Sequence, residues 1–140
     1  MAELRMIPAW LDRSAYPFTL RVFSAPEGDM RYVDEGQGEV ILFVHGNSTW
    51  SFMYRELIKG LRARYRCVAP DHLGFGLSDK PRGATYLPQM HAENLQAFIQ
   101  GLGLKDITLV LHDWGGPIAM AYATAHPENI KRLVVLNTTC

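Results

Sequence analysis

Hydrophobic and polar residues follow two patterns along this chain, an alternating one near the start and continuous apolar runs further on. FTLRV and MRYVD alternate apolar and polar positions, which is typical of strands with one buried face, and the turn-forming APEGD between them predicts a hairpin. VILFV is wholly apolar and ITLVL almost so, which indicates parallel strands that are covered on both faces. Six strands are predicted, at residues 18–22, 30–34, 40–44, 66–69, 107–111 and 132–136.

Segments with helical spacing lie between the later strands. Apolar residues recur at intervals of three and four in 50–61, 88–102 and 115–126, and Gly101 and Gly103 are stop signals for the second helix. Strands that alternate with helices after an antiparallel start indicate an α/β fold with a mostly parallel sheet. Such sheets carry their chemistry at the carboxyl ends of the strands, where this chain has HGN after the third strand and HDWGG after the fifth.

Composition narrows the classes of function. The 140 residues suit one domain with its own core, and 14 basic residues balance 14 acidic ones. Neither sign forms a block, so we expect no nucleic acid partner and no binding to an anionic membrane surface. Cys67 and Cys140 form no CxxC pair and no zinc spacing, and no apolar run is long enough to span a bilayer. We therefore expect a chain of the reducing cytoplasm, without a metal or a cofactor.

Asp113 stands where the fifth strand turns into a helix, and two interpretations are open for it. An aspartate there commonly caps the helix by accepting a free backbone N–H. Gly115 and Gly116 follow at once, although glycine costs a helix about 1 kcal/mol relative to alanine. Glycines at this place allow close helix–strand contact and a sharp turn that lifts the side chain at its apex, as in a nucleophile elbow. A carboxylate at that apex can attack a saturated carbon and form an ester, which water hydrolyses with the help of a general base.

FVHGNSTWSFMYR, DHLGFGLSDKP and LVLHDWGGP, in this order, resemble the haloalkane dehalogenases of the α/β-hydrolase superfamily. The resemblance implies that Asp113 is the nucleophile and that the side-chain N–H groups of Asn47 and Trp114 bind the departing halide in a dry pocket. It also implies an oxyanion hole made by the backbone N–H of Trp114 and by the loop at Asn47. Uncharged donors suit a leaving halide, because it gains negative charge with no proton to help it. The implied ligands are a haloalkane, water and the halide ion, with no cofactor.

Other interpretations stay open for these residues. Asn47 is also an ordinary turn residue, and Trp114 is also a buried aromatic anchor. Epoxide hydrolases share the HDWGG elbow but generally have a bulky residue where this chain has Asn47, and they use tyrosines of the cap domain. Ser48 departs from the dehalogenases, which commonly have proline after the asparagine.

The remaining histidines and one further aspartate have structural interpretations. Asp71 and His72 follow the fourth strand as a possible acid–base pair, but we expect them to shape the GFGLSD loop instead. His45 is also expected to shape its loop, and His91 and His126 to be structural or solvated.

The resemblance also implies segments beyond residue 140. In the family the fold has eight strands and a cap domain, and the base histidine and the triad acid are expected after this position. One subgroup has its acid at the end of the sixth strand, where this chain has Asn137, which cannot orient a histidine as a carboxylate does. We therefore interpret residues 1–140 as the amino-terminal part of a single α/β-hydrolase core domain. Its sixth strand would be an open apolar edge, so we expect self-association or a second chain that completes the sheet. The alternative to an enzyme is a catalytically incomplete half-domain that acts only by association.

Overall fold

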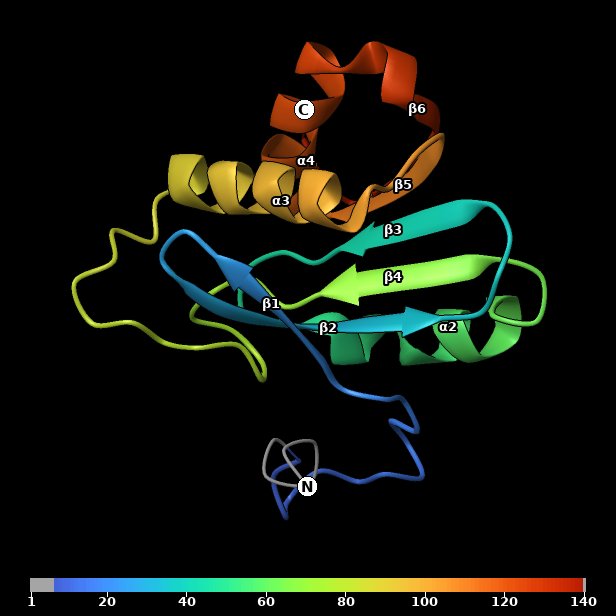
Figure 1. Cartoon of the computed structure of the whole chain (residues 1–140), viewed down its shortest axis with the longest axis vertical. Helices are drawn as coiled ribbons and strands as arrows, with labels where there is room; N and C mark the ends of the chain where they lie inside the picture. Colours follow the sequence, from blue (N-terminus) through green and yellow to red (C-terminus); the bar gives the residue numbers. More distant parts are fainter. Residues whose placement is uncertain (1–6, 140) are drawn as a thin grey trace.

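A six-stranded sheet in the order β1-β2-β4-β3-β5-β6 forms the centre of the computed structural model, which describes residues 7–139 (Figure 1). The strands are β1 (Arg21–Ala25), β2 (Gly28–Glu35), β3 (Val40–Val44), β4 (Arg66–Pro70), β5 (Ile107–His112) and β6 (Ile130–Leu136). The helices are the 3₁₀ turns η1 (Ser51–Tyr54) and η2 (Pro127–Asn129) and the α-helices α2 (Arg55–Leu61), α3 (Pro88–Leu102) and α4 (Gly115–Ala125). β2 pairs antiparallel with β1 and with β4, whereas β4, β3, β5 and β6 are parallel to one another. The predicted hairpin and the predicted α/β fold with a mostly parallel sheet are confirmed.

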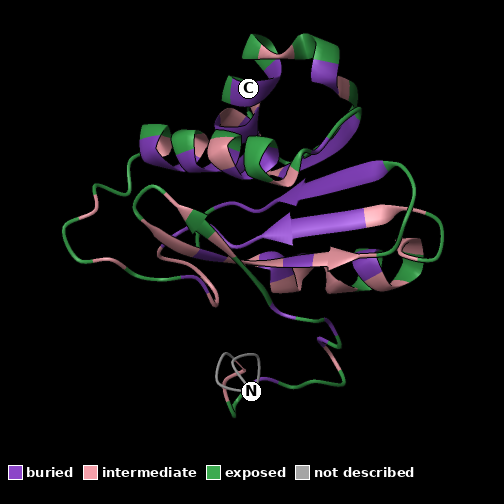
Figure 2. Cartoon of the chain, in the orientation of Figure 1, coloured by how far each residue is buried: buried purple, intermediate pink, exposed green. Residues whose placement is uncertain are grey.

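Helices cover both faces of the sheet because the side chains of the parallel strands alternate between two cores (Figure 1). Leu42 and Val44 of β3 belong to a core shared with α3 and α4, whereas Ile41 and Phe43 belong to a core shared with α2. β3 is buried along its whole length, and β4 is buried from Cys67 onward (Figure 2). Burial of each large apolar side chain contributes roughly 1.5–3 kcal/mol. The two cores therefore hold the carboxyl ends of the central strands in place.

The first strand begins later than its alternating pattern predicts. β1 pairs with β2 from Arg21 onward, and Phe18 and Leu20 lie before it in the core on the α2 side. The backbone N–H of Thr19 donates to the Glu35 side chain, at 3.2 Å, in place of a strand partner. The alternation therefore reflects burial against this core, although these residues are not part of a strand.

The second predicted helix matches α3 at both ends, and Gly103 ends it. Gly103 has φ +63°, and the N–H groups of Gly103 and Leu104 bond back to carbonyls of the last turn, as in a Schellman motif. The expectation that Gly101 is a stop signal is wrong, because Gly101 lies inside the helix. It makes room for the ring of Phe23, which a Cβ at this position would approach to 2.5 Å.

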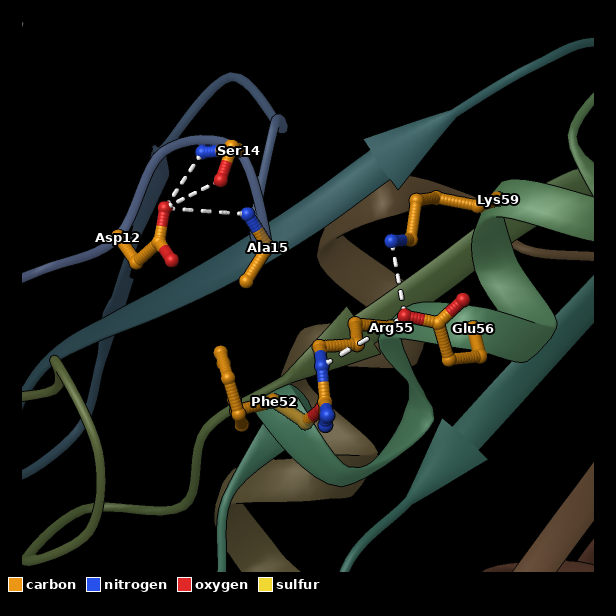
Figure 3. Close-up of polar contacts among 7 residues, drawn as sticks. All are labelled: Asp12, Ser14, Ala15, Phe52, Arg55, Glu56 and Lys59. Carbon is orange, nitrogen blue, oxygen red and sulfur yellow. Dashed lines mark hydrogen bonds and ion pairs between the residues drawn. The ribbon is translucent and has the colours of Figure 1, made fainter.

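The first predicted helix begins as the 3₁₀ turn η1 and continues as α2 (Figure 3). At the junction the Arg55 guanidinium donates to the Phe52 carbonyl at 3.0 Å and lies 4.0 Å from the Phe52 ring centre. Glu56 and Lys59 form an exposed ion pair at 2.8 Å one turn further on. Asp12, in the same view, closes a separate turn near the start of the described chain. The Arg55 contacts therefore join the 3₁₀ turn to the α-helix.

The apolar residues of β6 are exposed, unlike those of β3. Leu133, Val134, Val135 and Leu136 keep 38–50% of their surface exposed. Among residues 7–139, β6 stands at the end of the sheet order, with β5 as its neighbour. This part of the fold therefore has the apolar edge that the sequence predicts. The association expected to cover it stays a prediction, which light scattering tests: we expect a mass above that of the monomer.

The structure of residues 7–139 does not test the cytoplasmic location that the two cysteines led us to expect. Cys67 is fully buried, and burial raises the pKa of its thiol to about 11, while Cys140 lies outside the described residues. Within residues 7–139, no helix is both long enough and apolar enough to cross a membrane. The reducing cytoplasm expected from the cysteines stays a prediction.

Candidate active site

The turn between β5 and α4 has the sharp geometry expected around Asp113. Asp113 has φ +52°, in the left-handed region that residues other than glycine rarely adopt. Gly115 brings the first turn of α4 against β3, because a Cβ there would collide with the carbonyl oxygen of Val44. Gly116 makes room for the segment after β6, and a Cβ there would lie 2.6 Å from the carbonyl oxygen of Thr139. Both glycines are required by these contacts, and the turn lifts Asp113 to the carboxyl edge of the sheet.

The Asp113 carboxylate does not cap its own helix. Trp114 is the N-cap residue of α4, and its side chain makes no capping hydrogen bond. Asp113 Oδ2 instead accepts the backbone N–H of Asn47, in the loop after β3, at 2.8 Å. The backbone N–H groups of Trp114 and Asn47 hold the pKa of Asp113 below its ordinary value. At neutral pH the side chain is therefore an ionised carboxylate beside the two backbone donors expected for an oxyanion hole.

Gly46 allows this carboxylate to reach the loop after β3. A Cβ at Gly46 would lie 2.5 Å from both the Cβ and the Oδ2 of Asp113. Any larger residue would therefore push the carboxylate away from the Asn47 N–H. The HGN motif directed attention to Asn47, but this role of its glycine follows only from the structure.

Asn47 and Trp114 line one pocket of about 280 Å³ at this edge of the sheet, together with Gly46, His72, Phe75, Tyr86, Pro88, His91 and Ile118. Its walls are mostly apolar or aromatic, with few polar groups, as in many ligand sites. Asp113 adjoins this pocket through its contact with Asn47, and itself lines a second pocket of about 370 Å³ with Trp114 and the residues that follow β6. The structure therefore brings Asp113, Asn47 and Trp114 together.

The two expected halide donors are accessible in this part of the fold. Asn47 is exposed and Trp114 is 50% exposed, and both residues lie in turns at the end of the sheet. The dry pocket, and the alternative of Trp114 as a buried aromatic anchor, concern the whole fold, so both stay predictions.

His45 and His72 join the loops after β3 and β4. The His45 ring bonds to the Gly46 carbonyl at 2.8 Å and accepts the backbone N–H of His72 at 2.9 Å, while His72 Nε2 lies 2.9 Å from the His45 carbonyl. Burial lowers the pKa of His45 to about 4, and it lowers the pKa of His72 as well. The interpretation of both histidines as loop-shaping residues is confirmed.

Asp71 is buried, and its carboxylate is bonded to backbone groups on both sides. Oδ1 accepts the Ser51 N–H at 2.8 Å, and Oδ2 accepts the Leu77 N–H at 2.9 Å. Asp71 thereby joins the start of η1 to the GFGLSD loop, as expected. Burial raises its pKa to about 6. At 1% exposed, Asp71 cannot contact a substrate, so its role is to position these loops.

Two features of the site come from the structure, although the sequence had marked Ser48 as a departure from the dehalogenases. The Thr138 hydroxyl donates to the Asp113 carbonyl, and so fixes the elbow from the segment after β6. Ser48 has φ +60°, a conformation that is closed to proline, whose φ is near −65°. The loop at Asn47 therefore has a shape that a chain with proline at this position cannot adopt. The contact of Thr138 spans 25 residues and leaves no pattern in one sequence, whereas Ser48 in place of proline was visible and only its backbone angle was not.

Of the other residues considered from the sequence, His91 and Asn137 line the pockets and His126 lies away from them. His91 is buried and lines the first pocket, and Asn137 lines the second. His126 follows α4 and lies 3.5 Å from Glu128. In the part of the chain that the structure describes, no group of three or more His, Cys, Asp or Glu side chains is placed to hold a metal ion.

Comparisons with known proteins agree on the fold. A family model described as alpha/beta hydrolase fold matches residues 39–140. The chain is 48% identical over 127 residues to haloalkane dehalogenase 2 of Mycobacterium tuberculosis, a match that covers 91% of this chain and 44% of that protein. It is also 48% identical over 125 residues to the cis-3-alkyl-4-alkyloxetan-2-one decarboxylase of Shewanella oneidensis, with 87% of this chain and 39% of that protein covered. The chain thus spans less than half the length of these curated relatives.

Solved structures resemble this chain to a similar degree. A crystal structure of an ancestral haloalkane dehalogenase has a TM-score of 0.81 and 36% identity, over 85% of this chain and 42% of that one. A mutant of an epoxide hydrolase from Bacillus megaterium has a TM-score of 0.77 and 34% identity, over 84% of this chain and 42% of that one. These proteins share a fold and differ in the reactions that their names describe.

Proposed function

The chain belongs to the alpha/beta hydrolase fold family, and from this premise we propose that it is a haloalkane dehalogenase-like hydrolase with Asp113 as its nucleophile. One observation carries the proposal. An ionised carboxylate stands on a left-handed elbow, accepts the Asn47 backbone N–H at 2.8 Å, and adjoins a pocket lined by Asn47 and Trp114. A helix cap would need none of these three features.

In the first step one oxygen of the Asp113 carboxylate attacks the halogen-bearing carbon. The new carbon–oxygen bond forms as the carbon–halogen bond breaks, and the halide leaves with the bonding electron pair. The lowered pKa of Asp113 keeps the attacking group ionised. The product is an alkyl ester on Asp113.

The side chains of Asn47 and Trp114 are the proposed donors to the halide. Both line the same pocket, and both are uncharged, so neither attracts the Asp113 carboxylate into an ion pair. A preorganised donor of this kind typically contributes roughly a hundredfold to a thousandfold in rate.

The second step is hydrolysis of the ester by a water that a general base activates. If Oδ1 attacks the substrate, Oδ2 becomes the carbonyl oxygen of the ester and stays beside the Asn47 N–H, which would then stabilise the oxyanion. The base histidine and the triad acid are expected at positions after residue 140. Ester hydrolysis requires these groups and ester formation does not, so the two half-reactions are measured separately.

Decarboxylation of an oxetan-2-one is a second candidate reaction, favoured by the relative in Shewanella oneidensis. Asp113 would attack ring carbon 4 and break its bond to the ring oxygen, which leaves a carboxylate on the adduct. Carbon dioxide then leaves, the electron pair of its carbon–carbon bond forms an alkene, and the Asp113 ester bond breaks to regenerate the carboxylate. This reaction consumes no water, so its products distinguish it from hydrolysis.

Incubation with 1-bromohexane tests the proposal. We expect the protein to gain the mass of one hexyl group and to release bromide in step with it; bromide beyond one equivalent shows that the ester is also hydrolysed. A folded chain that gains no mass and releases no bromide contradicts the proposal. Incubation with a cis-3,4-dialkyloxetan-2-one, followed by measurement of alkene and carbon dioxide, tests the second reaction.

Trp114→Phe tests the proposed donor. The phenyl ring keeps an aromatic side chain but has no indole N–H, so we expect adduct formation to slow roughly a hundredfold. Trp10→Phe is the matched control, because Trp10 is 68% exposed and lines neither pocket. An equal effect of both substitutions would show that Trp114 does not act as a donor.

A further inference from the structure

The carbonyl oxygen of Asp113 accepts two hydrogen bonds, one from inside the elbow and one from outside it. The Gly116 N–H donates to it at 3.0 Å, from the first turn of α4. The Thr138 hydroxyl donates to the same oxygen from the segment after β6. Thr138 Oγ1 also lies 3.2 Å from the Thr139 carbonyl, which is the longer of its two contacts. The Asp113 carbonyl is therefore the preferred acceptor of this hydroxyl.

The chain around Thr138 is shaped so that its hydroxyl reaches the elbow. β5 and β6 are paired up to their last residues, so Asp113 and Asn137 follow neighbouring strands side by side. Asn137 has φ +42°, a left-handed conformation that turns the chain after β6. Gly116 leaves the space that Thr138 occupies, because a Cβ there would collide with the Thr138 hydroxyl. These features together place the hydroxyl on the Asp113 carbonyl.

The left-handed conformation of Asp113 needs such support. A residue other than glycine is less stable at φ +52° than in the right-handed helical region, and keeps such a conformation only where its surroundings fix it. If Asp113 relaxed toward that region, its carboxylate would leave the Asn47 N–H, which it contacts at 2.8 Å. A hydrogen bond to the Asp113 carbonyl opposes this change, because it fixes the peptide group between Asp113 and Trp114.

We propose that Thr138 is a positioning residue for the nucleophile: its hydroxyl holds the elbow so that the Asp113 carboxylate stays beside the Asn47 N–H, in the position from which it attacks. This inference rests on the proposed function, because it assigns the attack to Asp113. Thr138 acts through the backbone of Asp113. Its loss is therefore expected to change the rate of attack more than the binding of the substrate.

Thr138→Val tests this role, because valine has nearly the shape of threonine and lacks the hydroxyl. Adduct formation at a series of 1-bromohexane concentrations gives the maximal rate constant and the concentration at half-maximal rate. We expect Thr138→Val to lower the maximal rate constant about tenfold and to change the half-maximal concentration less than about twofold. Thr138→Ser keeps the hydroxyl, so we expect it to recover most of the lost rate.

Thr124→Val is the matched control. The Thr124 hydroxyl also donates to a backbone carbonyl, that of Met120, at 2.8 Å. Thr124 lies exposed near the end of α4 and lines neither of the two pockets at the elbow. We therefore expect its adduct rate to stay within about twofold of the wild-type rate.

Hydrogen exchange of the Asn47 amide tests the same role without any reaction. This N–H donates to Asp113 Oδ2, so displacement of the carboxylate would leave it free to exchange. We expect Thr138→Val to speed this exchange about tenfold, measured by NMR. Thr138→Ser and Thr124→Val should leave it close to the wild-type rate.

Three results would overturn the inference: no change in either measurement for Thr138→Val, an equal loss in Thr138→Ser or Thr124→Val, or a loss that falls mainly on the half-maximal concentration. Failure of the proposed function looks different. The folded wild-type chain then forms no adduct, while exchange of the Asn47 amide still decides whether Thr138 holds the elbow.

Discussion

Asp71 and Asp113 follow the two strands that flank β3, and each has a histidine beside it in the sequence, yet their surroundings differ. Asp71 is 1% exposed, and each of its carboxylate oxygens accepts a backbone N–H. Asp113 is partly exposed, and its Oδ2 accepts the N–H of Asn47. Burial raises the pKa of Asp71 to about 6, whereas the backbone N–H groups of Trp114 and Asn47 lower the pKa of Asp113.

The difference shows that a place at the carboxyl end of a parallel strand does not by itself make a carboxylate a nucleophile. An attacking oxygen must be ionised and must be accessible to the substrate. Asp113 meets both conditions. Asp71, with a pKa of about 6, is also mostly ionised at pH 7, but it is buried and so fails the second condition. It instead holds the loop that runs from Asn47 to Ser51 in place.

Replacing the two aspartates one at a time tests this division of roles most strongly. We expect Asp113→Asn to slow adduct formation with 1-bromohexane at least about a thousandfold, because a neutral amide is a far weaker nucleophile than a carboxylate. Asp71→Asn should keep the rate per folded chain within about fivefold, since Asp71 contacts no substrate. Mass spectrometry over time measures both rates, and circular dichroism gives the folded fraction. Equal losses in the two variants would contradict the division.

The two aspartates should also differ in how they make the free energy of unfolding depend on pH, and Asp71 should have the larger effect. Because its pKa is raised to about 6, the folded chain retains a proton that the unfolded chain has already released above about pH 4. The contribution of Asp71 to the free energy of unfolding therefore falls as the pH rises from about 4 to about 6, by roughly 2–3 kcal/mol. Asp113 contributes in the opposite sense, since its lowered pKa favours the folded chain until the pH falls through that pKa.

Urea denaturation between pH 4 and 7 measures this dependence. The buried histidines raise the stability of both chains alike as the pH rises through this window, because their pKa values are lowered. We therefore expect the wild-type chain to lose roughly 2–3 kcal/mol of stability relative to Asp71→Asn between about pH 4 and pH 6, because asparagine does not titrate. The same pH dependence in both chains would show that Asp71 is not the titrating group.

A glycine lies against each of the two aspartates, so substitution of these glycines tests the two roles separately. A Cβ at Gly46 would lie 2.5 Å from Asp113 Oδ2, so we expect Gly46→Ala to displace the carboxylate and slow adduct formation about tenfold to a hundredfold. Gly76 has φ +51°, and a Cβ there would lie 2.7 Å from Asp71 Cγ, so we expect Gly76→Ala to lower the free energy of unfolding by about 1–3 kcal/mol. Its adduct rate per folded chain should change far less than that of Gly46→Ala.

Gly60 is the control for both glycine substitutions. It lies in α2, and a Cβ there would meet no atom within 4 Å. We expect Gly60→Ala to raise the free energy of unfolding by about 0.5–1 kcal/mol, because alanine favours the helix, and to leave the adduct rate unchanged. Destabilisation by Gly60→Ala would mean that the effect at Gly76 is not specific to its contacts.

Most of the fold could be predicted because its signals are local. The apolar run of β3 and the helical spacing of α3 depend on residues within a few positions of one another, and both elements have the predicted bounds. The first strand was placed too early because burial and strand pairing produce the same alternation. Only the pairing of β1 with β2 tells them apart.

The site could be predicted only in part. Asp113 and Asn47 were found because their residue types and their place after a strand suit a known chemistry, and the structure places them in contact. The contact of Thr138 with Asp113 and the place of His91 in the pocket depend on segments that are far apart in the chain. The exposure of Trp114 depends on what surrounds it in space, which no local pattern specifies.

The position of the alkyl group along the chain tests the central claim most directly. After incubation with 1-bromohexane, the chain is digested and its peptides are sequenced by mass spectrometry. We expect a hexyl ester on Asp113 and none on Asp71. A hexyl group on a different carboxylate, or unmodified Asp113 in a folded chain, would contradict the role of Asp113 as the nucleophile.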